Sequence, residues 1–346
     1  MDATGVVIIG RNEGTRLAAC IRSIRASAPA GTPIVYVDSA STDQSVQVAQ
    51  ENGAEIVQLN PAVAFTAARA RNAGAEFLLN RHPELVFLQL ADGDTEMHPR
   101  WMVHAMDYLR HHPAVAVVCG RRRERSPEAS VYNLLADMEW DTPIGAAEEF
   151  GGDSLMRVEA FRKAGGYRAE FIAGEEPDLA ARLRLAGHGI VRLNHEMTLH
   201  DLGMTRFMQW WRRTVRSGHA LAQLAHTHGG EPLYFYRGPW RSTLFWGLAV
   251  PAGILFLIVV ATWWAIFLLP LAYAYLLARV MRYRLRRGDD RDSAFAYGIF
   301  TTIGKFPQLV GLVRFYRNRW SKRQSTIIEY KADASPNPVT APIGNT

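Results

Sequence analysis

One uncharged stretch constrains the possible folds of this chain more than any other feature. The sequence from Ser242 to Ala278 contains no Asp, Glu, Lys, Arg or His. A helix that crosses a bilayer needs roughly 20 apolar residues, because it rises about 1.5 Å per residue through a hydrocarbon core about 30 Å thick. The stretch is too long for one such helix, so we predict a transmembrane hairpin over residues 242–281 with its turn near residues 261–264. The alternative, one long buried helix of a soluble domain, rarely runs this far without a charge.

The charges around this stretch predict the orientation of the hairpin. The basic segments "YRGPWR" and "RVMRYRLRR" lie before and after it, and the predicted turn has no charge. Cytoplasmic loops are enriched in Lys and Arg, so both ends of the hairpin are expected in the cytoplasm. The N-terminal sequence "MDATGVVIIG" has neither the basic region nor the long apolar stretch of a signal peptide. We therefore expect a multi-pass protein of the inner (cytoplasmic) membrane, with its N-terminal domain facing the cytoplasm.

The rest of the C-terminal sequence divides into three segments. Residues 231–241 are predicted to be a basic linker before the hairpin. Residues 282–330 are a basic juxtamembrane region, and its apolar part, residues 294–313, is interrupted by a lysine and a proline. We expect an interfacial or re-entrant helix there, with its basic end on anionic lipid. The Pro-rich polar tail, residues 331–346, is expected to be disordered.

Residues 1–230 alternate between short apolar runs and amphipathic stretches. The runs "GVVIIG", "PIVYVDSAS", "AEIVQL" and "ELVFLQLAD" have the character of buried strands, and apolar residues at helical spacing lie between them. Strand and helix repeated in this way indicate an α/β domain with a mostly parallel sheet covered on both faces. In open sheets of this kind, ligands bind where the strands end at their carboxyl side.

Composition narrows the choice of partners. The formal net charge is +6 and the sequence pI is about 9.4, which favours anionic partners such as nucleotides, phospholipid headgroups or nucleic acid. The only cysteines are Cys20 and Cys119, which excludes a disulfide framework or a cysteine-rich metal site.

Carboxylates follow two of the predicted strands. Asp38 ends one strand, and Asp92 and Asp94 end another, with Gly93 between them to let the backbone bend. Two carboxylates at this spacing suit Mg²⁺ or Mn²⁺, which take oxygen ligands from carboxylates, phosphates and water. The alternative is a solvated turn of ordinary Asp and Gly residues. The first turn, "GRNEG", lacks the dinucleotide fingerprint G-x-G-x-x-G, and the P-loop pattern is absent too. A metal ion is therefore left to hold a diphosphate.

Five segments, taken in order, carry a resemblance to a known family. The segments "VVIIGRNEG", "VYVDSASTDQS", "ARARNAG", "LADGDTEMHPRWM" and "AGEEPDLAARLRLAG" resemble the motifs of inverting family 2 glycosyltransferases with the GT-A fold, of the membrane-anchored bacterial type. The similarity covers residues 4–220. It implies a nucleoside diphosphate sugar as donor, with uridine as the expected base. It also implies Mg²⁺ or Mn²⁺ as cofactor and no nucleic-acid partner.

The same resemblance implies a set of donor-binding residues. Asp38 would contact the uracil or the ribose, and Glu13 would lie nearby. Arg71 would approach the nucleotide, although by itself it is equally well explained as a solvated charge on a helix. Gly152 and Asp153 would line the pocket of the donor sugar.

The resemblance also implies metal ligands and a catalytic base. Asp92 and Asp94 match the metal motif, with Asp94 as the more direct ligand, and His200 matches a histidine that often joins the metal shell. Glu176 falls on the position of the base, where the family has Asp, and the choice between Glu176 and Glu175 stays open. A base must come within about 3 Å of the acceptor hydroxyl, so the longer side chain would shift the place of the acceptor.

Other polar patterns have simpler explanations. Asp178 is in the first turn of a predicted helix, where the helix dipole favours an acid. The segment "FMQWWRRTVRSGHA" has Arg213 where processive polysaccharide synthases carry Trp, so we expect transfer of a single sugar. A helix on the membrane surface and an amphipathic helix packed on the domain both fit this segment. "GRRRERSP" is most simply a solvated basic loop.

Two classes of function follow from these features. The first is a membrane-anchored glycosyltransferase that moves one sugar to a lipid-linked or other membrane-associated acceptor in glycan or exopolysaccharide synthesis. An alternative within this class is a synthase of a polyprenyl-phosphate sugar. The second class is a membrane-tethered nucleotide-sugar-binding protein without turnover. The set Asp38, Asp94 and Glu176 favours an enzyme, because a binding protein has no need of a base.

Overall fold

A mixed sheet forms the centre of the N-terminal half. The computed structural model describes residues 3–322, so the predicted disordered tail lies outside the described residues. The strands of this range are β1 (Thr4–Gly10), β2 (Ile34–Asp38), β3 (Glu55–Gln58), β4 (Phe87–Asp92), β5 (Thr95–Met97), β6 (Val115–Glu124), β7 (Gly145–Ala146), β8 (Ser154–Arg157) and β9 (Gly189–His200). Their order in the sheet is β3-β2-β1-β4-β8-β6-β9-β5, and β7 pairs with β9.

Parallel pairing brings the ends of β1, β2 and β4 to one edge of the sheet. β1 pairs in parallel with both β2 and β4, and β2 pairs in parallel with β3. The register sets Gly10 opposite Asp38 and Ile9 opposite Asp92. Beyond β4 the sheet becomes mixed, because β8 runs antiparallel to β4 and β6. The α/β architecture is the one predicted, and the carboxylates after β2 and β4 lie at the same edge.

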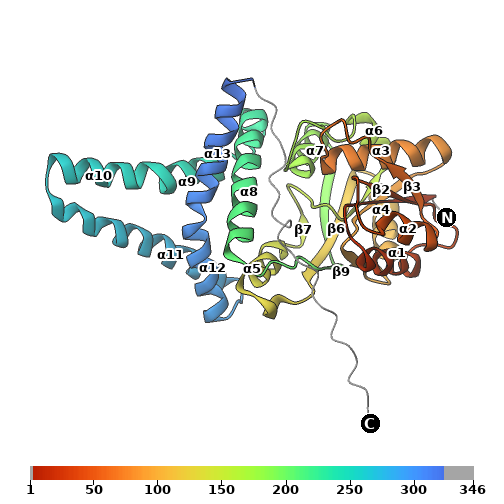
Figure 1. Cartoon of the computed structure of the whole chain (residues 1–346), viewed down its shortest axis with the longest axis horizontal. Coiled ribbons are helices and arrows are strands. Elements are labelled where there is room, and N and C mark those ends of the chain that lie inside the picture. Colours follow the sequence, from red (N-terminus) through yellow and green to blue (C-terminus); the bar gives the residue numbers. More distant parts are fainter. Residues whose placement is uncertain (1–2, 323–346) are drawn as a thin grey trace, which may run out of the picture.

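Helices cover both faces of this sheet (Figure 1). They are α1 (Thr15–Ser27), α2 (Ser45–Glu51), α3 (Ala67–Arg81), α4 (Trp101–His111), α5 (Val131–Trp140), α6 (Val158–Lys163) and α7 (Glu175–Leu185). Side chains alternate along β1: the hydroxyl of Thr4 lies 3.2 Å from the sulfur of Met106 in α4, and Val7 contacts α3 instead. A Cβ atom on Gly74 of α3 would lie 2.4 Å from Cγ1 of Val7, so a glycine is needed for this close approach.

A helical hairpin projects from the rest of the molecule (Figure 1). Its first helix comprises α9 (Arg237–Leu244), a π-helical turn (Phe245–Ala249) and α10 (Val250–Val260). A 3₁₀ turn (Trp263–Phe267) then opens α11 (Leu268–Arg286). Both helices, Arg237–Val260 and Trp263–Arg286, are long and apolar enough to cross a membrane. The break between them falls within the predicted turn.

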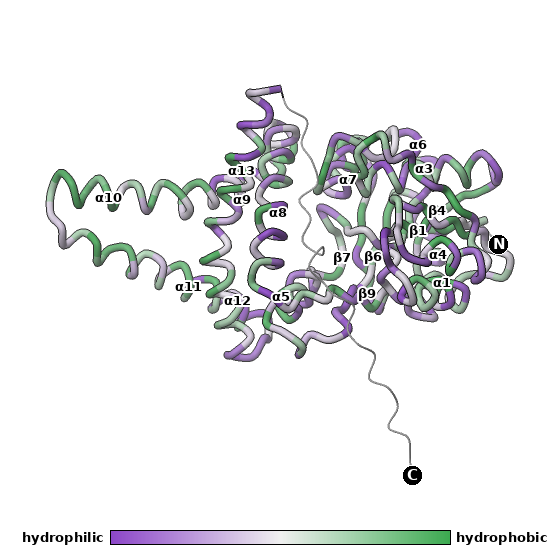
Figure 2. The backbone as a smooth tube through the Cα atoms, in the orientation of Figure 1, coloured by the Kyte–Doolittle hydropathy of each residue, from purple (hydrophilic) through white to green (hydrophobic). Residues whose placement is uncertain are grey.

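The hairpin differs from the prediction at its start. The first helix begins at Arg237, so residues 237–241 of the predicted linker are helical. Arg237 and Arg241 are compatible with a helix here, because long basic side chains near the end of a helix can extend away from its apolar part. Most of its apolar side chains face outward: Phe256 is 63% exposed and Val259 is 77% exposed. Figure 2 shows this apolar character along both helices.

The helices α8 (Phe207–His228), α12 (Arg291–Ile303) and α13 (Lys305–Trp320) join the hairpin to the sheet domain (Figure 1). The single interfacial helix expected over residues 294–313 is two helices, which meet at Gly304. α13 packs along α8, and a Cβ atom on Gly311 would lie 2.0 Å from the carbonyl oxygen of Val215. A Cβ atom on Gly218 would lie 2.1 Å from the carbonyl oxygen of Gln308. These two glycines let the helix backbones touch, so α13 is held firmly against α8.

Candidate active site

Two carboxylates and an imidazole meet where β4 ends. Ligand atoms of Asp92, Asp94 and His200 all lie within 4.8 Å of one another. Nε2 of His200 is 3.3 Å from Oδ2 of Asp94, and its Nδ1 is 3.7 Å from a carboxylate oxygen of Glu124. Oxygen ligands with one imidazole and no thiolate fit Mg²⁺ or Mn²⁺. The residues that the resemblance predicted as metal ligands are thus brought together, and these residues could hold a divalent cation.

Arg71 links this cluster to the predicted base. Its Nη2 lies 3.0 Å from Oδ1 of Asp92, and its Nη1 lies 2.9 Å from a carboxylate oxygen of Glu175 and 2.9 Å from one of Glu176. The side chain is 3% exposed, and its guanidinium lies over the ring of Tyr167. Arg71 is therefore no solvated helix charge. It is a buried cation held by three carboxylates, as burial of a charge requires.

The two glutamates differ in their surroundings, although both begin α7. The Glu175 side chain is 5% exposed and that of Glu176 is 15% exposed. Burial and the charge of Glu175 raise the pKa of Glu176 to about 7, and Arg71 only partly opposes this rise. Asp178 is fully buried, and its carboxylate lies 2.8 Å from His228 of α8 and 2.8 Å from Arg182. Asp178 thus anchors α7 to α8, in keeping with the structural role expected for it.

Gly152 and Asp153 lie directly behind Asp92. Asp153 is fully buried: Oδ1 accepts a hydrogen bond from the backbone N–H of Asp92 at 3.1 Å, and Oδ2 accepts one from the hydroxyl of Thr198 at 2.8 Å. Asp153 therefore ties the end of β4 to β9 and offers no exposed surface. A Cβ atom on Gly152 would lie 2.5 Å from Nη2 of Arg71. Glycine at this position leaves room for the ion pair of Arg71 with Asp92.

The donor-binding residues predicted near β1 and β2 form a second group. The carboxylate of Asp38 accepts hydrogen bonds from the hydroxyl of Ser41 at 2.5 Å, the backbone N–H of Ser41 at 2.9 Å and the hydroxyl of Tyr36 at 3.2 Å. It is 2% exposed, so it primarily fixes the turn after β2. Glu13 pairs with Arg16 at 2.9 Å. A Cβ atom on Gly93 would lie 3.0 Å from Cγ of Glu13, which places Glu13 beside the metal triplet.

Arg122 is a site residue that the sequence interpretation missed. Its Nη2 lies 3.1 Å from Oδ2 of Asp92, and its guanidinium lies 4.9 Å from the ring centre of Trp140. Burial raises the pKa of Asp92, but Arg71 and Arg122 outweigh burial and hold it below its usual value. The solvated basic loop expected from "GRRRERSP" is wrong, because residues 120–124 belong to β6 and Arg121 is 8% exposed. The signal available in the sequence was the apolar run "AVAVVCG" directly before the arginines, which could have placed them on the same strand.

Two further contacts were missed at the start of the hairpin and of α8. The hydroxyl of Tyr236, at the start of the hairpin, donates to a carboxylate oxygen of Glu149 at 2.5 Å. Burial raises the pKa of Glu149. The side-chain oxygen of Gln209 accepts the backbone N–H groups of Thr205 and Arg206, each at 3.0 Å, and so caps α8. The segment that holds Gln209 is a helix packed on the domain, since Trp210 is 4% exposed.

Sequence models of two known protein families match the N-terminal part of the chain. Residues 5–165 match the sequence model of glycosyl transferase family 2, and residues 134–206 match one described as the N-terminal domain of galactosyltransferase. A probable glucomannan 4-beta-mannosyltransferase 10 of Arabidopsis thaliana is 30% identical over 119 residues, which is 31% of this chain. The chain matches 21% of the length of that protein.

Solved structures share the fold at low sequence identity. The mannosyltransferase PcManGT from Pyrobaculum calidifontis, solved with GDP-Man and Mn²⁺, superposes with a TM-score of 0.65 at 18% identity, over 93% of this chain and 88% of that one. GalNAc-T7, solved with UDP, GalNAc and Mn²⁺, gives a TM-score of 0.52 at 14% identity, over 71% of this chain and 51% of that one. The strand order, the carboxylate edge and these matches agree. Residues 5–165 therefore form a domain of glycosyltransferase family 2, on the GT-A-like fold that the sequence predicted.

Proposed function

We propose that the protein transfers a single sugar from a nucleoside diphosphate sugar to a lipid-linked or other membrane-associated acceptor, with inversion at the sugar carbon. The observation that carries this proposal is the position of Arg71. It contacts both the metal-ligand candidate Asp92 and the base candidate Glu176. One buried side chain therefore fixes the distance between the two halves of the predicted chemistry.

The acceptor half of the reaction is assigned to Glu176. A base works best when its pKa lies near the working pH, and the pKa of Glu176 is about 7. Its carboxylate would take the proton of an acceptor hydroxyl while the acceptor oxygen attacks the sugar carbon from the side opposite the diphosphate. That single displacement inverts the configuration. Glu176 is more exposed than Glu175, so we assign the base to Glu176 and a positioning role to Glu175.

The leaving-group half is assigned to the cluster at the end of β4. Asp94, Asp92 and His200 would hold Mg²⁺ or Mn²⁺, and a bound cation would neutralise the charge that develops on the departing diphosphate. Glu124, 3.7 Å from Nδ1 of His200, would orient the ring. Arg71 and Arg122 keep Asp92 ionised and aimed at the cluster. Glu13 and Asp38 would shape the nucleotide end of the site through the turns after β1 and β2.

Membrane attachment is assigned to the hairpin. Its two helices are apolar and largely exposed, and the stacked rings of Trp263 and Trp264 lie at its tip, as is common for aromatic residues at a membrane interface. The basic residues at the other end support an inner-membrane protein with both hairpin ends in the cytoplasm. Cysteine labelling of intact cells tests this orientation. A cysteine at position 262 should react from outside, and one at position 286 should be protected; labelling at position 286 would contradict the orientation.

Donor identity can be tested by thermal stabilisation in the presence of Mn²⁺, because a ligand that binds only the folded state raises Tm. Uridine is the base that the resemblance favours, and the mannosyltransferase PcManGT, solved with GDP-Man, adds guanosine as a second candidate. UDP-linked sugars and GDP-mannose should therefore be compared on the full chain, each with and without Mn²⁺. A shift that requires Mn²⁺ supports the proposed donor class. The absence of any shift with every nucleotide sugar would contradict it.

A further inference from the structure

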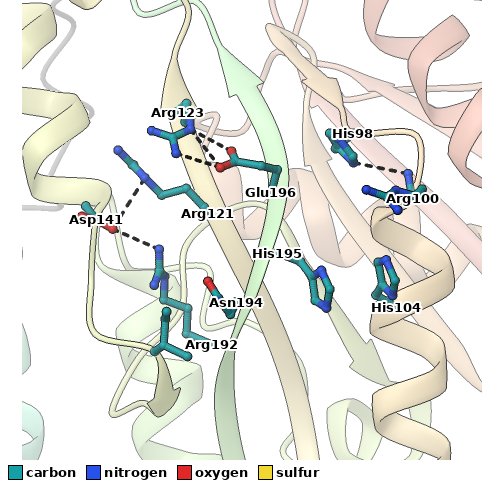
Figure 3. Close-up of a pocket in the computed structure, with 11 residues that line it drawn as sticks. His98, Arg100, His104, Arg121, Arg123, Asp141, Arg192, Asn194, His195 and Glu196 are labelled. Carbon is teal, nitrogen blue, oxygen red and sulfur yellow. Dashed lines mark hydrogen bonds and ion pairs between the residues drawn. The ribbon is translucent and has the colours of Figure 1, made fainter.

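A cavity of about 390 Å³ is lined by none of the residues of the metal cluster. Figure 3 shows its lining side chains. The cavity is bounded by Arg121 and Arg123 of β6, by residues of β9 and by the start of α4. Side chains alternate along a strand. Arg122, between the two arginines, points instead to Asp92 on the side of the candidate active site. The cavity therefore opens on the α4 side of the sheet, and the candidate active site lies on the α3 side.

A register shift in β9 keeps the two sites apart. Arg121 of β6 pairs with Glu196, and the next residue, Arg122, pairs with Thr198, so β9 has one extra residue at this point. Upstream of the shift, Arg192, Asn194 and Glu196 line the cavity. Downstream, Thr198 and His200 turn toward the candidate active site. The same strand thus supplies side chains to both sites without sharing any of them.

The floor of the cavity has more positive than negative charge. Arg121 is 8% exposed and Arg192 is 5% exposed. The carboxylate of Asp141 pairs with three guanidinium groups, at 3.1 Å from Arg192, 3.6 Å from Arg121 and 3.9 Å from Arg287, the residue that follows α11. Arg121 has a further partner in Asp137 at 2.7 Å. Nε of Arg192 is buried without a hydrogen-bond partner among the described residues.

The rim of the cavity adds further positive charge. Arg123 forms a bidentate pair with Glu196, at 2.8–3.0 Å. Arg100, at the start of α4, has no acidic partner among residues 3–322. His104 and His195 stack with ring centres 3.9 Å apart and supply further nitrogen atoms to the wall. Ion pairing inside the protein therefore leaves the guanidinium groups of Arg100 and Arg192 only partly satisfied.

We propose that this cavity binds a phosphate or diphosphate group, at a site separate from the donor site. Guanidinium groups bind phosphate oxygens in pairs of parallel hydrogen bonds, and Arg100, Arg121 and Arg192 surround a space that takes a group of this size. The wall is mostly polar, so the site recognises the charged group rather than an apolar body. A free phosphate compound and a phosphate-bearing lipid headgroup share this chemistry. The tie from Asp141 to Arg287 connects the cavity wall to the base of the hairpin.

Binding of sodium pyrophosphate to the full-length protein in detergent tests the site. The titration is performed calorimetrically with EDTA, to remove metal-dependent binding at the donor site, and against chloride of equal ionic strength. Arg100→Glu lies on the exposed rim and should weaken binding at least tenfold without loss of the fold; Arg192→Gln should do the same from the floor. Arg125→Gln is the control, because Arg125 is on the chain next to this strand but pairs with Glu96 outside the cavity. Asp94→Ala should leave pyrophosphate binding unchanged.

Three results would overturn the proposal: no binding to the wild-type protein, equal affinity for wild type and Arg100→Glu, or the same loss in Arg125→Gln. A second titration distinguishes the source of the phosphate. Short-chain phosphatidic acid, kept monomeric, is added as a competitor of pyrophosphate. Competition supports the site with a lipid headgroup as its ligand, and pyrophosphate binding without competition supports it with a soluble phosphate compound.

Discussion

The candidate active site and the hairpin differ in which side chains they bury and which they expose to solvent. The site buries charge, since Arg71 is 3% exposed and Asp153 is fully buried. The hairpin exposes apolar side chains, with Val259 77% exposed. Buried charges are stable only when paired, and the site provides its own pairs, from Arg71 to three carboxylates. The apolar side chains of the hairpin are not covered in this way within the molecule. Exposed apolar surface of this extent is a surface that contacts other apolar groups. Changes in the site should therefore act on chemistry, and changes in the hairpin should act through the surroundings.

The largest effect is expected from Asp94→Ala. A metal ion stabilises developing charge by several kcal/mol, so loss of its more direct ligand should lower transfer by on the order of 10³-fold or more. The fold should survive, because Asp94 lies at a strand end and not in the hydrophobic core. Rates of transfer and Mn²⁺-dependent donor binding measure the effect. Glu96→Ala is the matched control, because it removes a partly exposed carboxylate two residues away. Metal-dependent transfer at the wild-type rate in Asp94→Ala would remove this assignment.

Glu176→Gln comes next. It removes the base and keeps the shape, so kcat should fall by roughly 10²–10⁴-fold while donor binding persists. Glu175→Gln should reduce kcat less, because Glu175 only positions Arg71 in this assignment. Single-turnover measurements with saturating donor separate these two effects. If Glu176→Gln transfers normally, the acceptor needs no such base, which would favour a phosphate acceptor of the polyprenyl type.

Shortening the hairpin tests the other side of the comparison. Replacing residues 250–268 by a short glycine-rich turn removes most of the apolar span and leaves α8, α12 and α13 in place. Transfer to a membrane-embedded acceptor should fall by about 10²-fold, because tethering raises the effective concentration of the acceptor. Donor binding and transfer to a water-soluble acceptor analogue should change little. An equal loss with both acceptors would show that the hairpin belongs to the catalytic fold.

A smaller effect is expected from pH, which acts on the candidate active site through Glu176 and not on the uncharged stretch of the hairpin. The pKa of Glu176 is raised from 4.5 to about 7, so kcat/KM should fall about tenfold per pH unit below pH 7 as the base is protonated. Loss of the proton from Glu176 at higher pH activates the base but lowers the stability of the folded protein. The stability that the raised pKa of Glu176 contributes is fully present below pH 4.5 and is lost as the pH rises through 7. Glu176→Gln should therefore be roughly 1–3 kcal/mol more stable than the wild type at pH 8, as measured by denaturant unfolding. A lower stability of the variant at pH 8 would contradict the burial of this charge.

The sequence was sufficient for features that repeat along the chain. Strands ending at Asp38 and Asp92 followed from apolar runs, and the hairpin followed from its lack of charge. Contacts between distant residues were out of reach. Arg122 stands in a run of three arginines and looks solvated, yet it pairs with Asp92, thirty positions away. The pairing of Tyr236 with Glu149 spans a still longer separation. Such pairs depend on the strand order beyond β4, where the sheet turns mixed and local periodicity gives no register.

The close packing of α8 and α13 sets the order in which this protein can be completed during synthesis. α8 is made before the hairpin and α13 after it, yet the two helices meet backbone to backbone at Gly218 and Gly311. The ribosome must therefore deliver both apolar helices, and the chain must return past them, before the outer face of α8 is covered. Domains generally begin to fold from the N-terminus while the chain is still growing. The contact between α8 and α13 therefore forms only after the whole hairpin has been synthesised, so it is a late step of folding.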